Sequence, residues 1–233
     1  MLAPMSTIAG QLAFVVGSYH LLKHNKGKGV MIGHMDDMDP RVVTVIGAGV
    51  AGTQSILKAI DNKALVKVVD SSQSKLDDLK SKYGTENVEY ILSSKDSIQV
   101  SVNESDLVIG SVYVVGKEAP KVVTKDMLSS MNPGTVMVDV SIDQGGCFET
   151  SKPTTHDSPT FLENDIVHYC VTNMPGAVPL TATEALNKVS LSYVENLANN
   201  GIQNALDSDE HLRNGLNILD GRIVHPGVKE ALE

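Results

Sequence analysis

The sequence predicts an α/β fold: a doubly wound parallel sheet, with a long helix before it and a helical segment after it. A β-branched run at 42–46 leads into glycines at G-x-G-x-x-G spacing and then into a helical pattern. From residue 41 onward, strand-like and helix-like segments alternate, as they do in proteins with a parallel sheet. The runs at 106–112 and 135–140 are almost continuously apolar, which is typical of strands buried on both faces.

The first expected element is a helix at 4–22, followed by a loop at 24–40. One apolar face recurs at helical spacing, formed by Ile8, Leu12, Val15, Tyr19 and Leu22. Gly10, Ala13 and Gly17 form a second face of small residues, where another helix can approach closely. An exposed glycine costs a helix about 1 kcal/mol relative to alanine, so this face has a packing reason. The reason is either the domain's own core or a contact between subunits.

The remaining elements of the sheet domain follow from apolar periodicity and from turn residues. Strands are expected at 42–46, 65–69, 88–92, 106–112, 135–140 and 166–171, and helices at 50–60, 72–82, 96–103 and 125–131. Thr124 is a candidate N-cap, and Asn132-Pro-Gly134 is a stop signal. Right-handed crossovers between parallel strands then give a doubly wound domain.

The last part of the chain has a different pattern. We expect a helix at 181–199 that ends before Gly201, short helices at 202–213, a hairpin at 218–224 around Asp220-Gly221, and a helix beginning at Pro226. These residues are too few for an independent domain. The sequence therefore predicts one domain at 1–179, and at 180–233 either an appendage or part of a second domain.

The composition of the chain restricts its binding partners and its location in the cell. The net charge of −9 argues against nucleic acid and anionic membranes as partners. No stretch reaches the ~20 apolar residues of a membrane span, and residues 1–17 lack the basic region of a signal peptide. Cys147 and Cys170 have no metal-ligand spacing, so we expect no metal and two reduced, buried thiols. A cytoplasmic protein is predicted.

The glycine motif indicates a site for a dinucleotide. Gly47 permits a tight turn, Gly49 lets the backbone approach a pyrophosphate, and Gly52 lets helix and strand pack closely. The helix N-terminus then offers N–H groups to the phosphates. Asp70 ends the second strand, where it can accept both ribose hydroxyls and would repel a 2′-phosphate. The motif predicts a Rossmann domain that binds NAD rather than NADP; the alternative is a glycine-rich turn without a ligand.

Three further loops, at 111–120, 141–155 and 172–183, belong to the same edge of the predicted sheet. Asp143 follows a buried strand and can exchange protons with a reacting imine or carbinolamine, or it can cap its own loop. Asn173 can bond a carboxamide and the Met174 backbone can line a nicotinamide site; the alternative is a turn stiffened by proline. His168 fits a core histidine, and His156 fits a turn residue rather than a base.

Several segments together resemble the alanine dehydrogenase family, to which nicotinamide nucleotide transhydrogenase is related. They are residues 2–10, 46–53, 106–110, 119–124, 138–150, 153–156 and 167–179. The longest are Val-Asp-Val-Ser-Ile-Asp-Gln-Gly-Gly-Cys-Phe-Glu-Thr at 138–150 and Val-His-Tyr-Cys-Val-Thr-Asn-Met-Pro-Gly-Ala-Val-Pro at 167–179. The resemblance implies reversible oxidative deamination of L-alanine to pyruvate and ammonia with NAD, in a homo-oligomer.

The resemblance also assigns site residues by matching motif. Ser6 contacts the cofactor from the first helix; Gly47, Ala48, Gly49, Val50 and Gly52 hold the pyrophosphate; Asp70 binds the adenosine ribose with Lys75 nearby; Ser94 lies near the adenine; Val112 and Tyr113 line the groove; and Ile142, Asp143, Asn173 and Met174 surround the nicotinamide. Asp143 is the catalytic carboxylate in this assignment.

Two departures from the family affect the functional interpretation. The family has a further segment, ahead of the position where this chain begins, that carries the Arg, Lys and His side chains that act on the substrate. Leu180 also stands where the family usually has Arg. We therefore expect the isolated chain to bind NAD(H) and to turn over alanine poorly or not at all. We also expect it to associate through a partly exposed apolar face of Ala185, Leu186, Val189, Leu191, Val194 and Leu197.

Three functional interpretations stay open from the sequence. The first is an alanine dehydrogenase whose N-terminal segment comes from a separate chain or was lost from this one. The second is a non-catalytic NAD-binding fragment or partner subunit of a split or decayed alanine dehydrogenase. The third, less favoured, is an NAD-binding subunit of the transhydrogenase type, because the stretch 173–179 matches the alanine dehydrogenase version.

Overall fold

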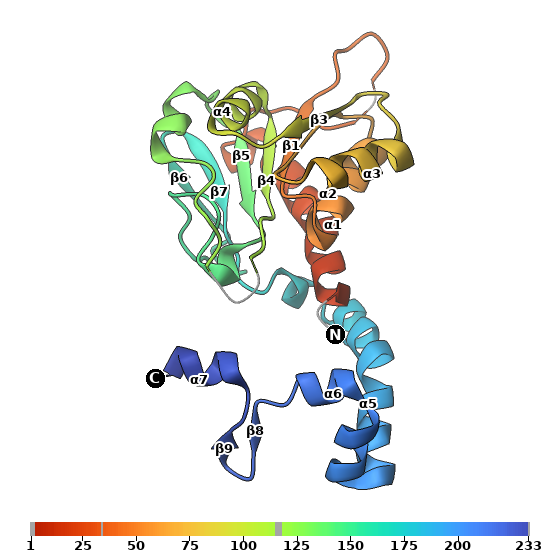
Figure 1. The fold of residues 1–233 in the computed structure, drawn as a ribbon. Helices are drawn as coiled ribbons and strands as arrows, with labels where there is room; N and C mark the ends of the chain where they lie inside the picture. Colours follow the sequence, from red (N-terminus) through yellow and green to blue (C-terminus); the bar gives the residue numbers. More distant parts are fainter. Residues whose placement is uncertain (1–2, 34, 115–117, 233) are drawn as a thin grey trace. The chain divides into compact units, whose positions relative to one another are not determined.

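The structure, a computed structural model, describes residues 3–33, 35–114 and 118–232. The chain divides into two compact units between Ala182 and Thr183. The first unit contains a seven-stranded sheet with helices on both faces, and the second contains helices and a two-stranded hairpin (Figure 1).

The sheet confirms the predicted doubly wound architecture. Its strand order is β3-β2-β1-β4-β5-β7-β6. The strands are β1 Val42–Ile46, β2 Leu65–Asp70, β3 Val88–Leu92, β4 Leu107–Gly110, β5 Val136–Asp139, β6 Thr160–Glu163 and β7 Ile166–Tyr169. All pair in parallel except β6, which runs antiparallel to β7. The order reverses between β1 and β4, so the carboxyl ends of these two strands flank the crevice where such sheets bind ligands.

Strand β6 was not predicted from the sequence. It forms a hairpin with β7 through Asn164 and Asp165, whose φ angles of 50° and 59° are those of a type I′ turn. Asn-Asp is a weaker signal for this turn than Asn-Gly, and a four-residue strand gives too short an alternating pattern to recognise.

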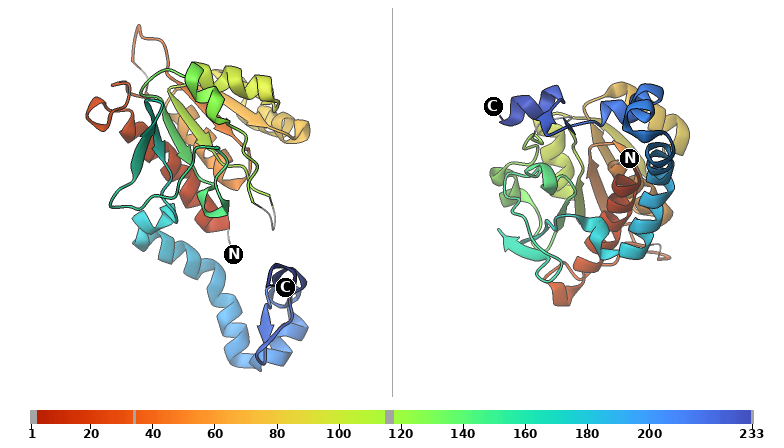
Figure 2. Two further views of the ribbon diagram at one scale, coloured as in Figure 1. Left: turned by 90° about the vertical axis from the view of Figure 1, so that its left-hand side faces the viewer. Right: turned by 90° about the horizontal axis from the view of Figure 1, so that it is seen from below.

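Two apolar clusters lie on opposite faces of the sheet. Helices α1 (Ala3–His20), α2 (Val50–Asp61) and α3 (Gln73–Tyr83) pack with one cluster, and α4 (Lys95–Glu104) and the 3₁₀ helix η2 (Lys125–Ser130) pack with the other. Figure 2 shows the red α1 and the yellow-green α4 on opposite sides of the strands. Side chains alternate along each strand: Leu107 and Ile109 belong to the first cluster and Val108 to the second.

The predicted helix at 125–131 is a 3₁₀ helix rather than an α-helix. Thr124 stands at its N-cap position, but the Thr124 side chain makes no capping hydrogen bond. At six residues it is longer than most 3₁₀ helices, which seldom exceed three or four residues.

Helix α1 packs with its small-residue face against the domain's own core. A Cβ on Gly10 would overlap the carbonyl oxygen of Ala51, and the Ser55 hydroxyl donates to the Gly10 carbonyl at 2.6 Å. The structure thus decides against a subunit contact for this face. The predicted apolar face is the more exposed one, since Val15 and Tyr19 are 54% and 53% exposed. The helix ends at His20, and a 3₁₀ turn, η1 Lys23–Asn25, follows.

The second unit follows the predicted order of elements. Its elements are α5 Pro179–Ser208, α6 Glu210–Asn214, β8 Ile218–Leu219, β9 Arg222–Ile223 and α7 Pro226–Leu232. Helix α5 begins in the first unit and is broken at Gly201, whose φ is 73°. The turn of the hairpin is Asp220-Gly221, both at positive φ. Ala205 and Leu206 are buried. In the predicted apolar face, Leu186, Leu191 and Val194 are exposed, and Ala185, Val189 and Leu197 are half-buried.

Candidate functional site

The glycine loop joins β1 to α2 at the crevice. Gly47 has a φ of 96°, and a Cβ there would lie 2.7 Å from the Ser111 carbonyl oxygen. A Cβ on Gly52 would overlap the Gly47 carbonyl oxygen. By contrast, a Cβ on Gly49 would meet no heavy atom of the described residues within 4 Å. Gly47 and Gly52 therefore serve the fold, while Gly49 leaves open space beside the first N–H groups of α2, where a phosphate can approach.

Asp70 ends β2 and ties that strand to the glycine loop. Its carboxylate accepts the Ala48 N–H at 2.7 Å through Oδ2 and the Ser72 N–H at 2.9 Å through Oδ1. Lys75 Nζ lies 3.6 Å from Asp70 Oδ2. The side chain is largely buried, yet each oxygen retains a second lone pair for a ligand hydroxyl. The structure thus places Asp70 beside the loop and Lys75 beside Asp70, and the binding of a ribose there stays a prediction.

The other residues assigned to the adenosine side stand at the same edge but have separate local roles. Ser94 follows β3 and caps α4, accepting the Ser97 N–H at 3.0 Å. Val112 and Tyr113 follow β4; the Tyr113 side chain is exposed, and the Val112 carbonyl accepts the Ser141 hydroxyl at 2.8 Å. Ser6 lies half-buried in the first turns of α1. Of the predicted loop at 111–120, residues 115–117 lie outside the described part of the chain.

A buried carboxylate that sequence reasoning missed holds the loop at 141–151. Asp139, at the end of β5, accepts N–H groups of Ser141 at 2.9 Å, Cys147 at 2.8 Å and Phe148 at 3.3 Å, and the Ser151 hydroxyl at 2.5 Å. Asp139 is fully buried. An aspartate inside an apolar strand pattern was the available signal, because a buried carboxylate requires several donors.

The structure brings Asp143 and Asn173 together from two different loops. Asp143 lies in a 3₁₀ turn, η3 Ile142–Gln144, and both of its carboxylate oxygens are 3.4 Å from the Asn173 backbone nitrogen. Asn173 adopts a left-handed conformation with a φ of 52°. Asp143 and Asn173 are exposed, whereas Ile142 and Met174 are each 4% exposed. These hydrogen bonds favour a role for Asp143 between loops over capping of its own loop.

The histidines differ in burial. His168 is fully buried; its Nε2 lies 2.8 Å from Thr150 Oγ1 and its Nδ1 lies 3.1 Å from the Ile166 carbonyl oxygen. Burial lowers the pKa of His168, so the prediction of a core histidine is confirmed. His156 lies exposed in a bend, as predicted, but its Nε2 is 3.4 Å from the Asn173 carbonyl oxygen. The sequence analysis did not foresee that contact.

Both cysteines are buried free thiols, as predicted. Burial raises the pKa of Cys147, and burial raises the pKa of Cys170 to about 12. Neither thiol is therefore a nucleophile at neutral pH.

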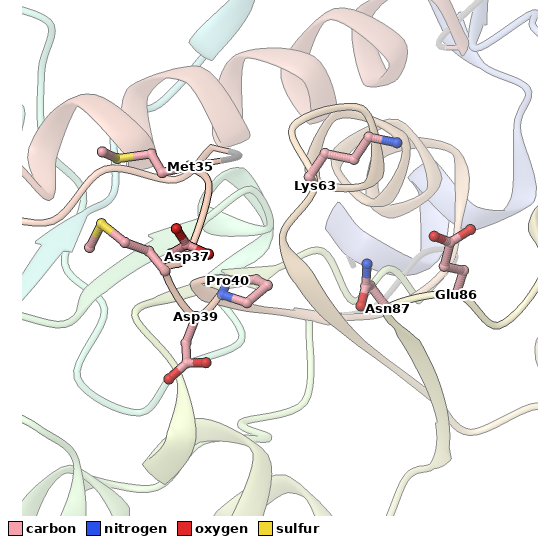
Figure 3. A pocket seen from close by; sticks show the side chains of 8 residues that line it. Met35, Asp37, Asp39, Pro40, Lys63, Glu86 and Asn87 are labelled. Atoms are coloured by element: carbon pink, nitrogen blue, oxygen red, sulfur yellow. The ribbon is translucent and has the colours of Figure 1, made fainter.

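A hollow of about 600 Å³ lies at the opposite edge of the sheet, where β1, β2 and β3 begin (Figure 3). It is lined by Met35, Asp37, Met38, Asp39, Pro40, Lys63, Glu86 and Asn87. None of these residues was assigned to the site, and doubly wound sheets bind ligands at the other edge. Among the described residues, no His, Cys, Asp or Glu side chains gather in a group that could hold a metal ion. No described helix is long and apolar enough to cross a membrane.

Comparison with known proteins gives a consistent family. A family model described as alanine dehydrogenase/PNT, C-terminal domain, matches residues 13–226. The chain is 47% identical to an alanine dehydrogenase of Halomonas elongata over 99% of its length, and 45% identical to one of Mycolicibacterium smegmatis over 100%. The chain spans 62% of the length of these relatives.

Solved structures give the same result. An L-alanine dehydrogenase superposes with a TM-score of 0.95 at 42% identity, covering 99% of this chain and 63% of that one. A transhydrogenase from Sinorhizobium meliloti superposes with a TM-score of 0.81 at 21% identity, covering 96% of this chain and 63% of that one; this likeness shows the shared fold alone.

Proposed function

The chain belongs to the family of the alanine dehydrogenase/PNT C-terminal domain, and from that premise we propose that it is the NAD(H)-binding part of an alanine dehydrogenase. The observation that carries the proposal is the glycine loop at the reversal point of the sheet. There the space over Gly49 is open, and Asp70 is anchored directly beside it.

The residues present fit a dinucleotide. The loop from Gly47 to Gly52 and the first N–H groups of α2 hold the pyrophosphate. Asp70 binds the adenosine ribose and disfavours a 2′-phosphate, so NAD is preferred over NADP. Ser6, Ser94, Val112 and Tyr113 complete the adenosine side, as the resemblance implies. When bound, NAD⁺ would accept a hydride from the α-carbon of a small amino acid. In the reverse direction, NADH would donate a hydride to the same carbon of the oxidised substrate.

On the nicotinamide side, Ile142, Asn173 and Met174 form the wall and Asp143 is the catalytic carboxylate. Asp143 is exposed and accepts from the Asn173 amide, so it is free on its outer side to exchange protons with a substrate.

Alanine turnover requires more than this site. Positioning of a substrate contributes ~7–11 kcal/mol to barrier lowering, and by resemblance the substrate-gripping side chains belong to the portion of the relatives that this chain does not match. We propose that this portion acts with the chain, either in the same polypeptide or as a separate partner, in a cytoplasmic homo-oligomer. A non-catalytic NAD-binding subunit is the second candidate, because the glycine loop and Asp70 are sufficient for that function.

A fluorescence titration with NADH tests the cofactor assignment. The chain contains no Trp, so the emission of bound NADH is read without indole interference. We expect saturable binding of NADH, displacement of bound NADH by ADP-ribose, and at least tenfold weaker binding of NADPH. Equal affinity for NADH and NADPH, or no binding of either, would contradict the role given to Asp70.

A second assay tests whether the chain needs a further portion for alanine turnover. Oxidation of NADH with pyruvate and ammonia is followed for the 233-residue chain and for Asp143→Asn. We expect little or no turnover by the chain alone. Turnover that Asp143→Asn abolishes would show that the chain holds its own substrate-gripping groups, and the proposed need for a further portion would then be wrong.

A further inference from the structure

The backbone N–H and the backbone carbonyl of Asn173 each contact an ionisable side chain from another segment. The Asn173 N–H points to the Asp143 carboxylate, at 3.4 Å from each oxygen. The Asn173 carbonyl oxygen lies 3.4 Å from His156 Nε2 and accepts the Gly176 N–H at 2.8 Å. Because a carbonyl can only accept, His156 Nε2 carries the proton in this contact.

Hydrogen bonds of Thr154 fix the position of the bend that contains His156. Thr154 pairs in parallel with Val171, and the Thr154 N–H donates to the Cys170 carbonyl at 2.9 Å. The Thr154 hydroxyl donates to the Pro159 carbonyl at 2.9 Å and so closes the bend that contains His156. The bend is therefore attached to the segment that leads into Asn173.

Gly176 lies beside the same contact. A Cβ on Gly176 would lie 3.3 Å from Asn173 Nδ2, which is tight, and 3.5 Å from His156 Nε2, which is ordinary van der Waals contact. The Asn173 side chain, the imidazole and Gly176 are therefore packed together.

Asn173 has a φ of 52°, in the left-handed region, which Asn adopts more readily than most other non-glycine residues. The contacts of its N–H with Asp143 and of its carbonyl with His156 and Gly176 hold the backbone in that conformation. We propose that His156 is a positioning residue for the nicotinamide end of the site. Its Nε2–H donates to the backbone carbonyl of Asn173 and thereby keeps the backbone N–H of Asn173 directed toward the Asp143 carboxylate. This inference rests on the proposed function.

The test compares two ligands that differ in the nicotinamide. ADP-ribose shares the adenosine, pyrophosphate and ribose of NADH but has no nicotinamide ring. His156→Phe keeps a ring but removes the donor, whereas His156→Gln keeps an amide N–H at the position of Nε2. His211→Phe, in exposed surface of α6, is the control. We expect His156→Phe to weaken NADH binding about fivefold, the equivalent of one hydrogen bond, and to leave ADP-ribose binding unchanged.

Rescue by His156→Gln to within about twofold of the unmodified chain completes the expected result. A merely structural role would weaken both ligands equally, and that outcome, or no change in either, would overturn the proposal. If the unmodified chain binds neither ligand, the proposed function fails instead. Amide hydrogen exchange at 173–176, measured without ligand, then still tests whether His156 positions Asn173. Faster exchange in His156→Phe than in the unmodified chain, but not in His156→Gln, supports the proposal. Equal exchange in all three proteins overturns it.

Discussion

The two halves of the candidate site are built in different ways. On the adenosine side, Asp70 accepts from Ala48 at 2.7 Å and from Ser72 at 2.9 Å, inside the core and within consecutive elements. On the nicotinamide side, Asp143 and Asn173 meet at 3.4 Å on the surface, from loops 30 residues apart. The first half is inseparable from the folded sheet. The second depends on two loops that can loosen while the sheet stays folded.

The largest effect is expected from a glycine on the adenosine side. Gly52→Ala would overlap the Gly47 carbonyl oxygen, so the β1–α2 junction must shift. We expect a loss of about 3 kcal/mol or more in the free energy of unfolding, measured by denaturant titration.

Gly49→Ala is the matched control for that loop, because its Cβ would enter open space. We expect an unchanged unfolding free energy but at least tenfold weaker binding of both NADH and ADP-ribose. If the two variants lost stability equally, the separation of fold-serving and ligand-facing glycines would be wrong.

An intermediate effect is expected from Asp139 on the nicotinamide side. Asp139→Asn puts an amide NH₂ or a weaker acceptor opposite the N–H groups of Ser141, Cys147 and Phe148. Hydrogen bonds to a charged group contribute about 1.5–3 kcal/mol, and we expect a loss of that order in the unfolding free energy.

Ligand binding to the same variant sharpens the comparison. Because the loop at 141–151 carries Asp143, Asp139→Asn should weaken NADH binding more than ADP-ribose binding. The exposed Asp143→Asn should change the unfolding free energy by less than about 0.5 kcal/mol. Equal stability of Asp139→Asn and Asp143→Asn would show that Asp139 does not hold the loop.

The smallest effect is a pH dependence of stability that comes from two buried histidines. Burial lowers the pKa of His168, and burial together with the nearby His24 lowers the pKa of His20; His20 packs against Tyr169 of β7. Between the lowered pKa and the ordinary value of about 6.5, the unfolded chain binds more protons than the folded chain. The free energy of unfolding is therefore unaffected by these histidines above about pH 6.5, and it decreases as the pH falls below that value.

Thermal unfolding at about pH 7.5 and 5.5 measures this dependence, with a lower Tm expected at the acidic pH. His168→Gln should reduce the difference between the two Tm values, and His20→Gln should reduce it independently. The exposed His211→Gln should leave it unchanged. A pH dependence that persisted in full in both buried-histidine variants would contradict this assignment.

The sequence predicted most of the sheet because the buried strands carry their own signal. Runs such as Leu107–Gly110 are apolar on both faces, and glycine spacing marked the β1–α2 junction. It did not predict Asp139, β6 or the His156 contact. These depend on pairings between distant segments, and nothing in a local pattern tells which donors will surround a carboxylate or which carbonyl an imidazole will reach.

Helix α1 shows a further limit. Its small and apolar faces were both recognised, but the apolar face of Val15 and Tyr19 turned out to be the exposed one. Close approach of Gly10 to Ala51 and of Gly17 to Leu107 selected the small face for the interior, which is a matter of steric fit rather than of hydrophobicity.

The short strand β6 forms one edge of the sheet, and its length limits the pairing of the sheet with other polypeptides. An edge strand offers unpaired backbone groups onto which another polypeptide can add, and this is a common route to aggregation. Here the edge is four residues long and ends at Glu163, which lies 2.9 Å from Lys125 Nζ and 3.8 Å from Lys152 Nζ. Its brevity and its charged end make the sheet a poor template for further strands.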